Sequence, residues 1–172
     1  MSRSERTNVF TEATEGTTAP SGYSEVVIKA SIKTPLEGYY VLESRESPEG
    51  KPEYPFLFNL DGQAALWKAV GQKETIPLYD ESGRESRDPE AGEGMKYHLE
   101  KKIRVAAGKH RVALGLPGAS YLVEVELTLQ AGGPDLLEFK PRYRYKTHPT
   151  RIPTFFKGVD GYEIFLNGDP IT

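Results

Sequence analysis

The chain has 172 residues, with 22 Lys and Arg residues against 25 Asp and Glu residues, and a formal net charge of -3. This length suffices for one domain with its own core, because a domain of about 150 residues buries roughly two thirds of its unfolded surface. The absence of cysteine excludes disulfides, thiol catalysis and cysteine zinc sites. The acidic balance argues against a general nucleic-acid binder.

Residues 1–23 are rich in Ser, Thr, Glu and Gly and contain few apolar anchors. Such a segment cannot bury enough surface to offset its ordering entropy, so we predict a flexible tail or tether, followed by a single domain over residues 24–172. The first residues lack the apolar core of a signal peptide. Either the protein is cytosolic, or this is a mature form whose leader has been replaced by a methionine.

From Val26 onward, apolar residues recur with a period of two, which is typical of half-buried strands. Turn dipeptides such as Asp61-Gly62 and Asn167-Gly168 separate the runs. Many short alternating runs with Gly and Pro turns favour a sandwich or a barrel, and we predict an all-β, antiparallel, immunoglobulin-like β-sandwich. The expected strand segments are 26–32, 38–43, 56–60, 102–105, 112–116, 123–129, 137–148 and 162–166.

Two segments depart from this pattern. The window 63–70 has a helix-like composition but is too short for its propensity to decide, so helix and strand both remain open. Residues 80–94 contain six carboxylates and, up to Gly94, no apolar residue larger than Ala. We predict a long acidic surface loop there.

The segment Phe139 to His148 alternates bulky and basic residues. In an extended strand, successive side chains point to opposite faces, so the basic residues share one face. This face is either a sheet edge protected by charge or a docking surface for an anionic partner. The predicted binding residues are Lys140, Arg142, Tyr143, Arg144, Tyr145, Lys146 and His148.

An ordered set of motifs carries a family resemblance. Phe56-Leu-Phe-Asn-Leu-Asp-Gly is followed by Gly108-Lys-His-Arg-Val, by Tyr121-Leu-Val-Glu-Val and by Leu136-Leu-Glu-Phe. Over about residues 56–140 this order resembles the PEGA-type β-sandwich modules of bacterial envelope proteins. The resemblance implies a non-enzymatic module outside the cytoplasm. Immunoglobulin-like and transthyretin-like sandwiches are the alternatives.

The remaining candidate chemistry is weak. His98, His110 and His148 lack the spacing of zinc ligands, and the acidic loop does not follow the EF-hand pattern, so we expect no metal and no cofactor. Glu124 and Glu126 would lie about 7 Å apart on one strand face, where a solvated face is commoner than a glycosidase site. No other motif indicates catalysis.

The sequence therefore predicts a non-enzymatic binding or scaffold module of the bacterial envelope, a periplasmic or surface lipoprotein. Its partner would be an envelope protein or an anionic polymer, with no nucleic acid, and it would meet the membrane only through a lipid anchor outside this chain. The alternative is a carbohydrate-binding or carbohydrate-active domain. An exposed platform of Trp67 with tyrosines would favour that alternative, and the lack of one would favour the scaffold.

Overall fold

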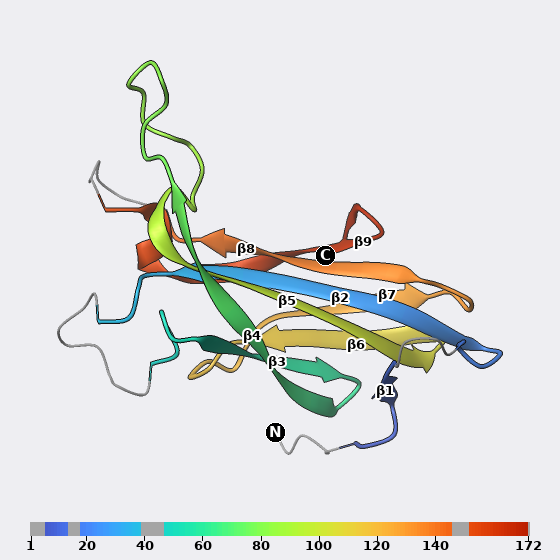
Figure 1. Ribbon diagram of the computed structural model, residues 1–172. Helices are drawn as coiled ribbons and strands as arrows, with labels where there is room; N and C mark the ends of the chain where they lie inside the picture. The colour runs from blue at the N-terminus through green and yellow to red at the C-terminus, as the bar shows by residue number, and fades with distance from the viewer. Residues whose placement is uncertain (1–5, 14–17, 39–46, 146–151, 172) are drawn as a thin grey trace.

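The computed structural model describes residues 6–13, 18–38, 47–145 and 152–171, and these residues form strands joined by turns and loops, with one short 3₁₀ helix (Figure 1). The elements are β1 (Phe10–Glu12), β2 (Tyr23–Thr34), β3 (Glu53–Leu60), β4 (Gln63–Ile76), β5 (Gly92–Ala106), β6 (Gly108–Gly115), β7 (Tyr121–Leu129), β8 (Asp135–Tyr143), η1 (Thr154–Lys157), β9 (Val159–Leu166) and β10 (Asp169–Ile171).

The strands form one curled, barrel-like sheet in the order β10-β9-β8-β2-β5-β4-β3-β6-β7, with β1 added on β5. The predicted all-β class is confirmed, but the predicted sandwich is not. The long strand β4 explains the difference: residues 63–70 pair with β3, whereas residues 71–76 pair with β5, so β4 joins what would otherwise be two sheets. The pairing is antiparallel except between β2 and β8, which run parallel.

The open window 63–70 is a strand. Leu60 pairs with Gln63, so β3 and β4 form a two-residue hairpin through Asp61 and Gly62, whose φ angles are 50° and 95°. Positive φ at both central residues is the requirement of the tight turn that matches strand twist, and Asp-Gly tolerates it. This local turn decides the conformation that propensity left open.

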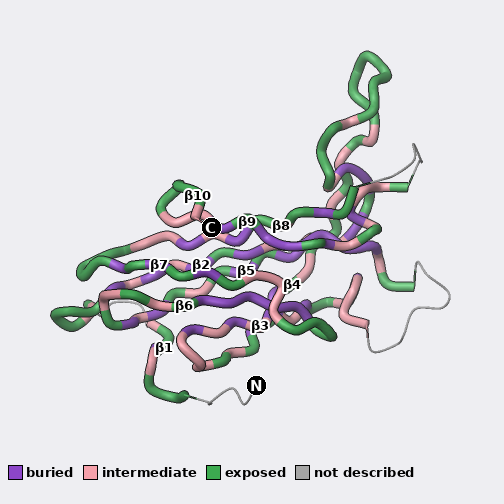
Figure 2. The backbone as a smooth tube through the Cα atoms, turned by 180° about the vertical axis from the view of Figure 1, so that it is seen from behind, coloured by how far each residue is buried: buried purple, intermediate pink, exposed green. Residues whose placement is uncertain are grey.

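The sheet encloses one core, and buried positions occur along most of the strands (Figure 2). On β7, Val125, Leu127 and Leu129 are buried while Glu124 and Glu126 are exposed, so the predicted faces of this strand are confirmed. Of the segment predicted over 38–43, all but Gly38 lies outside the described residues.

The predicted acidic loop over 80–94 joins β4 to β5 and extends away from the sheet (Figure 1). Its real limits are residues 77–91, because β5 begins at Gly92. Near its tip, the Asp80 carboxylate accepts hydrogen bonds from the backbone N–H groups of Ser82 and Arg84. The base of the loop is packed against the sheet, since Ala91 is buried.

Part of the predicted flexible tail, residues 10–12, forms the strand β1. β1 pairs with β5 in the register Phe10 to Val105, and Phe10 is only 5% exposed. A single aromatic residue with a prepared pocket outweighs the polar composition around it, because burying a Phe side chain contributes about 2–3 kcal/mol. Residues 1–5 and 14–17 of the predicted tail lie outside the described residues.

We predict that Phe10→Ala lowers the free energy of unfolding by about 3 kcal/mol, because it leaves a cavity between packed aromatic rings. Urea denaturation followed by circular dichroism measures the change. Thr11→Ala, at the exposed neighbour on the same strand, is the control and costs less than about 1 kcal/mol. Equal effects of the two substitutions would show that Phe10 does not anchor the N-terminal segment.

Leu127→Ala tests the faces of β7. Because Leu127 is buried among core residues, its truncation costs about 2–4 kcal/mol of unfolding free energy. Thr128→Ala, on the exposed face next to it, costs about 0.5 kcal/mol or less. Thermal or chemical denaturation of both variants gives the comparison, and a reversed ranking would mean that the faces are exchanged.

Candidate functional site

The candidate site lies where β2 and β8 separate. Their parallel pairing runs from Val26 with Asp135 to Ala30 with Phe139 and stops there. In a parallel ladder of this register, the next hydrogen bond would come from the N–H group of residue 141 to the Ser31 carbonyl. Pro141 has no N–H group, so the ladder ends and the two strands part.

Two tyrosines bond the β2 backbone groups beyond this point. The Tyr162 hydroxyl donates to the Ser31 carbonyl oxygen at 3.0 Å, and the Lys33 N–H donates to the Tyr143 hydroxyl at 2.9 Å. Tyr143 in turn donates to the Glu90 carboxylate. The hydroxyls thereby take the place of a neighbouring strand, which buried backbone groups require.

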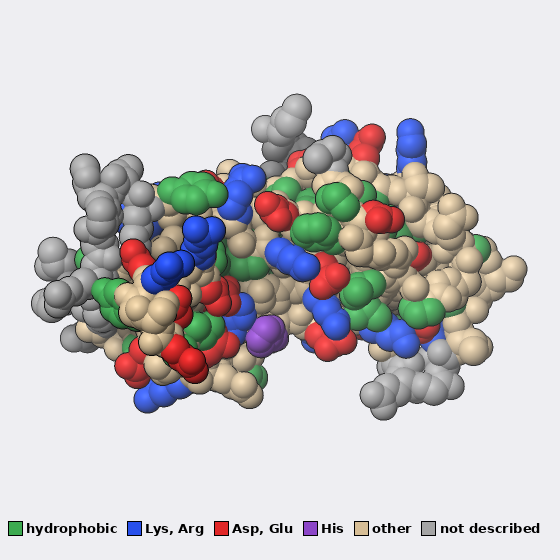
Figure 3. Space-filling view, turned by 90° about the horizontal axis from the view of Figure 1, so that it is seen from above, with side chains coloured by type: hydrophobic (Ala, Val, Ile, Leu, Met, Phe, Trp, Pro, Cys, Tyr) green, Lys and Arg blue, Asp and Glu red, His purple; other side chains and the backbone are tan. Residues whose placement is uncertain are grey.

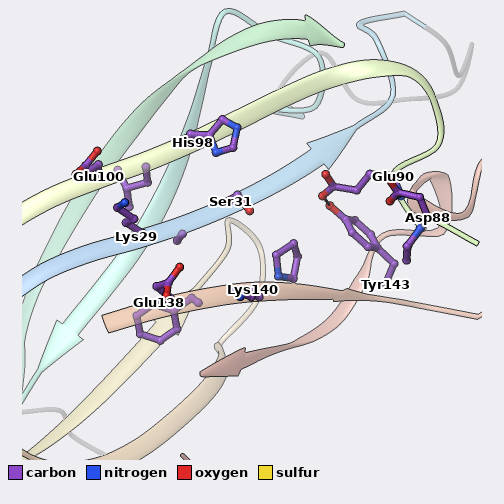
Figure 4. A pocket seen from close by; sticks show the side chains of 14 residues that line it. Lys29, Ser31, Asp88, Glu90, His98, Glu100, Glu138, Lys140 and Tyr143 are labelled. Carbon is purple, nitrogen blue, oxygen red and sulfur yellow. Dashed lines mark hydrogen bonds between the residues drawn. The ribbon is translucent and has the colours of Figure 1, made fainter. Parts of the chain in front are cut away.

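The place where β2 and β8 separate, after Ala30 and Phe139, is called the fork below. A groove of about 580 Å³ lies over the fork, on the outer face of the sheet (Figure 4). β5, β2 and β8 line it side by side, and Tyr143 with the loop segment Asp88–Glu90 closes one end. Its polar and charged lining residues are Lys29, Ser31, Asp88, Glu90, His98, Glu100, Glu138, Lys140 and Tyr143.

Glu90 fastens the loop that closes the groove. Its carboxylate binds both the Lys96 ammonium and the Tyr143 hydroxyl. Its carbonyl oxygen accepts a hydrogen bond from Lys33 Nζ at 2.7 Å, and the Gly92 carbonyl accepts a second one at 2.8 Å. The end of the groove is therefore held by charged hydrogen bonds, together with the backbone bond from the Phe155 N–H to the Pro89 carbonyl at 3.1 Å.

Lys33 is a fully buried cation. Its side chain has no exposed area, and its ammonium lies 3.2 Å from Glu74 Oε1 and 4.9 Å from the centre of the Phe155 ring. The Glu74 contact is an ion pair without hydrogen-bond geometry, since this oxygen has no hydrogen-bond partner. A buried charge needs such compensation, so Lys33, the loop and η1 pack as one unit.

The open part of the groove carries both signs of charge. Lys29 is in register with Glu100 on β5 and with Glu138 on β8. Within the described chain, no ion pair joins these three side chains. The lining residues include two lysines and four carboxylates, so the groove itself does not favour an anion.

The structure places the predicted binding residues in different surroundings. Lys140 and Arg142 are exposed, but Lys140 Nζ lies over the Phe165 ring at 4.6 Å and Arg142 is bonded to Asp160 at 2.9 Å. Tyr143 is buried, and its hydroxyl bonds Lys33 and Glu90 within the chain instead of a partner. Lys146 and His148 lie outside the described residues.

Arg144 and Tyr145 come after the end of β8, and both are exposed. The predicted alternation thus holds through Tyr143, with buried Phe139 and Tyr143 on one side and exposed Lys140 and Arg142 on the other. Tyr145 breaks it, because it is 85% exposed instead of packed. A register shift between Arg142 and Tyr143 marks where β8 leaves regular pairing with β9.

The edge-protection interpretation is wrong for residues 135–139 of β8, which lie between β2 and β9. Lys140 and Arg142 come after the point where pairing with β2 stops. The basic residues also do not stand alone: seen from above, positive and negative side chains are mixed over the surface (Figure 3). Neither reading of the sequence anticipated that Asp160 would neutralise Arg142.

The other residues that the sequence analysis considered as site candidates make contacts within the chain. Trp67 is buried and stacks on Phe58, with ring centres 4.8 Å apart. Glu124 and Glu126 both pair with Arg111, at 3.2 and 3.7 Å. His110 contacts the Asp61 carboxylate at 2.6 Å, which links the two turn motifs that carry the family resemblance.

In the part of the chain that the structure describes, no group of three or more His, Asp or Glu side chains is placed to hold a metal ion. No helix among those residues is long and apolar enough to cross a membrane.

Comparison with known proteins adds no identification: no family model, no curated protein and no solved structure matches this chain.

Stability at high pH reports on the fork. Burial, together with the neighbouring Glu90 carboxylate, raises the pKa of Tyr143 above its ordinary value of 10, and burial also raises that of Tyr162. Above pH 10 the unfolded chain loses these protons while the folded chain keeps them, so stability present below pH 10 falls as the pH rises. We predict that Tyr143→Phe reduces this loss by up to about 1.4 kcal/mol per pH unit.

The measurement is the free energy of unfolding from about pH 9 to about pH 12, a range that includes the ordinary tyrosine pKa. Tyr145→Phe, at an exposed tyrosine outside the fork, is the matched control. An identical slope in the Tyr143→Phe variant and the parent chain would show that this hydroxyl titrates freely.

Proposed function

We propose that this protein is a non-enzymatic binding module that docks an anionic partner on the exposed cationic end of β8. The observation that carries the proposal is the exposure of Arg144 next to Tyr145, with no ion pair to the Arg144 guanidinium among the described residues. Lys140, which is exposed on the same strand, extends this surface, whereas Arg142 beside it is bonded to Asp160. Arg and Tyr are the residue types that dominate interface energies, and the planar guanidinium suits carboxylate or phosphate.

A neighbouring cation supports the same surface. The Arg144 N–H donates to the Gly158 carbonyl at 3.0 Å, which places Arg144 beside the end of η1. Lys157, the last residue of η1, is exposed there. An acidic segment that reaches Arg144 therefore finds a second positive charge nearby.

The described residues of the groove include one serine and one histidine, on neighbouring strands. Ser31 and His98 are register partners on its wall, and they are its nearest approach to a nucleophile with a base. No hydrogen bond joins these two side chains in the described structure, and no third group orients the histidine. Nothing at the groove thus activates the Ser31 hydroxyl.

The position of Trp67 argues against sugar stacking. Its ring is inside the core, and the exposed tyrosines Tyr23, Tyr79 and Tyr145 lie on separate elements. This arrangement favours an acidic polypeptide or polymer over a carbohydrate as the partner. A periplasmic or surface location, as a lipoprotein, is part of the proposal and rests on the resemblance to PEGA-type modules alone.

Binding of fluorescent poly-L-glutamate at about 0.01 M and about 0.15 M ionic strength tests the proposal. We expect Lys140→Glu with Arg144→Glu to weaken binding at least about tenfold, and the parent chain to lose affinity as salt increases. Arg142 is left in place because its reversal would put two carboxylates side by side at Asp160.

Lys68→Glu with Lys73→Glu is the matched control. Both residues are exposed on β4, and the pair changes the net charge by the same amount. Equal loss of binding in the two double variants would reduce the effect to overall charge and overturn the proposed surface.

A further inference from the structure

The N-terminal strand β1 fills a gap that the rest of the sheet leaves open. The first part of β4, residues 63–70, pairs with β3, and only its last part, Gly71–Ile76, pairs with β5. Farther along the same edge of β5, β1 pairs with Ile103–Val105. β1 therefore takes the place beside β5 that β4 has left.

The other edge of β1 is held by a side chain. The Gln63 amide oxygen accepts hydrogen bonds from the Val9 and Phe10 N–H groups at 2.7 and 2.9 Å, and its nitrogen donates to the Phe10 carbonyl at 2.9 Å. One amide group thus offers the donor and the acceptor that a peptide group of a neighbouring strand would offer. Together with β5 it forms a slot with hydrogen-bonding groups on both sides.

An aromatic pocket lies at the bottom of this slot. Phe10 lies edge-on to Phe58 and Trp67, with ring centres 5.7 and 6.3 Å away. The Glu12 carboxylate lies 3.8 Å from Lys101 at the rim. The slot therefore selects an extended segment with an aromatic anchor, followed two residues later by an acid.

β1 can leave the slot without disturbing β2. The ladder covers three residues, the Ala13 and Arg6 N–H groups add one backbone bond each, and one large side chain is buried, so opening the segment costs far less than unfolding the domain. β1 and β2 lie on opposite edges of β5, about 10 Å apart at the usual strand spacing. The ten residues 13–22 between them span up to about 33 Å when extended.

We propose that this slot is a strand-acceptor site that exchanges β1 for residues 6–13 of a second copy of the chain. The segment fits the slot by construction, because the same residues fill it within one chain. The backbone edge of β5 provides the affinity and the pocket at Phe58 and Trp67 provides the specificity, as in other strand-addition complexes. Linkage within one chain gives β1 a millimolar effective concentration, so exchange is a property of concentrated protein.

Trp67 is the only tryptophan of the chain, so its fluorescence reports what occupies the pocket. The first experiment titrates a synthetic peptide of residues 6–13 into the full chain carrying Phe10→Ala. We expect the peptide to change Trp67 emission, and the same peptide with Ala at position 10 to leave it unchanged. The parent chain, whose own β1 competes, should need at least about tenfold more peptide.

The second experiment measures the oligomeric state at high protein concentration by sedimentation. The parent chain should form a dimer, Phe10→Ala alone should not, and a mixture of the two should give a mixed dimer in which the parent donates its strand. Phe10→Leu, which leaves a smaller cavity, serves as a second acceptor chain where the alanine variant is unfolded.

Binding that ignores Phe10, no binding by either folded acceptor chain, or dimers that form equally well in the Phe10→Ala variant would each overturn the exchange. The charge-reversal pair at Lys140 and Arg144 leaves the slot untouched, so its effect on poly-L-glutamate binding is read independently.

Discussion

Side-chain hydrogen bonds to backbone complete this sheet where its own ladder stops. A curled sheet must satisfy its buried N–H and C=O groups, yet Pro141 ends the β2–β8 pairing and β4 turns away from β5. Tyr162 and Tyr143 bond the free groups of β2, and Gln63 bonds those of β1. Three side chains thus allow one sheet to enclose a core without regular closure.

The buried Lys33 ammonium likewise depends on hydrogen bonds, which it makes to backbone carbonyls at the base of the loop. Loop residues 77–91 contribute little apolar surface, but the carbonyl of Glu90 caps Lys33 and its carboxylate bonds Tyr143. A buried cation without these partners would carry a large desolvation penalty, so the loop base and the sheet depend on each other. Glu90 therefore both compensates the buried charge and lines the end of the groove.

Much of the fold was predictable because it depends on local patterns. Alternation identified the faces of β7, and the turn at Asp61-Gly62 contained enough information to extend β3 into a hairpin. The neighbours of β8 were not predictable, since nothing in its residues indicates a parallel strand more than a hundred positions earlier, as in the pair Val26 and Asp135. The available signal was Pro141 inside an alternating run, which marks the end of a ladder. For the N-terminal segment, Phe10 was the one residue that indicated packing against the core, and the polar composition around it favoured a flexible tail instead.

The placement of β2 gives the molecule an uneven mechanical response. A pull on the N-terminal segment reaches β1 first, and only three residue pairs join this strand to β5. The pull then reaches β2, which is bonded to β5 over twelve residues and to β8 on its other edge. Because these hydrogen bonds lie across the direction of the pull, they resist it together. The N-terminal strand β1 therefore detaches under a smaller load than β2, which resists the pull.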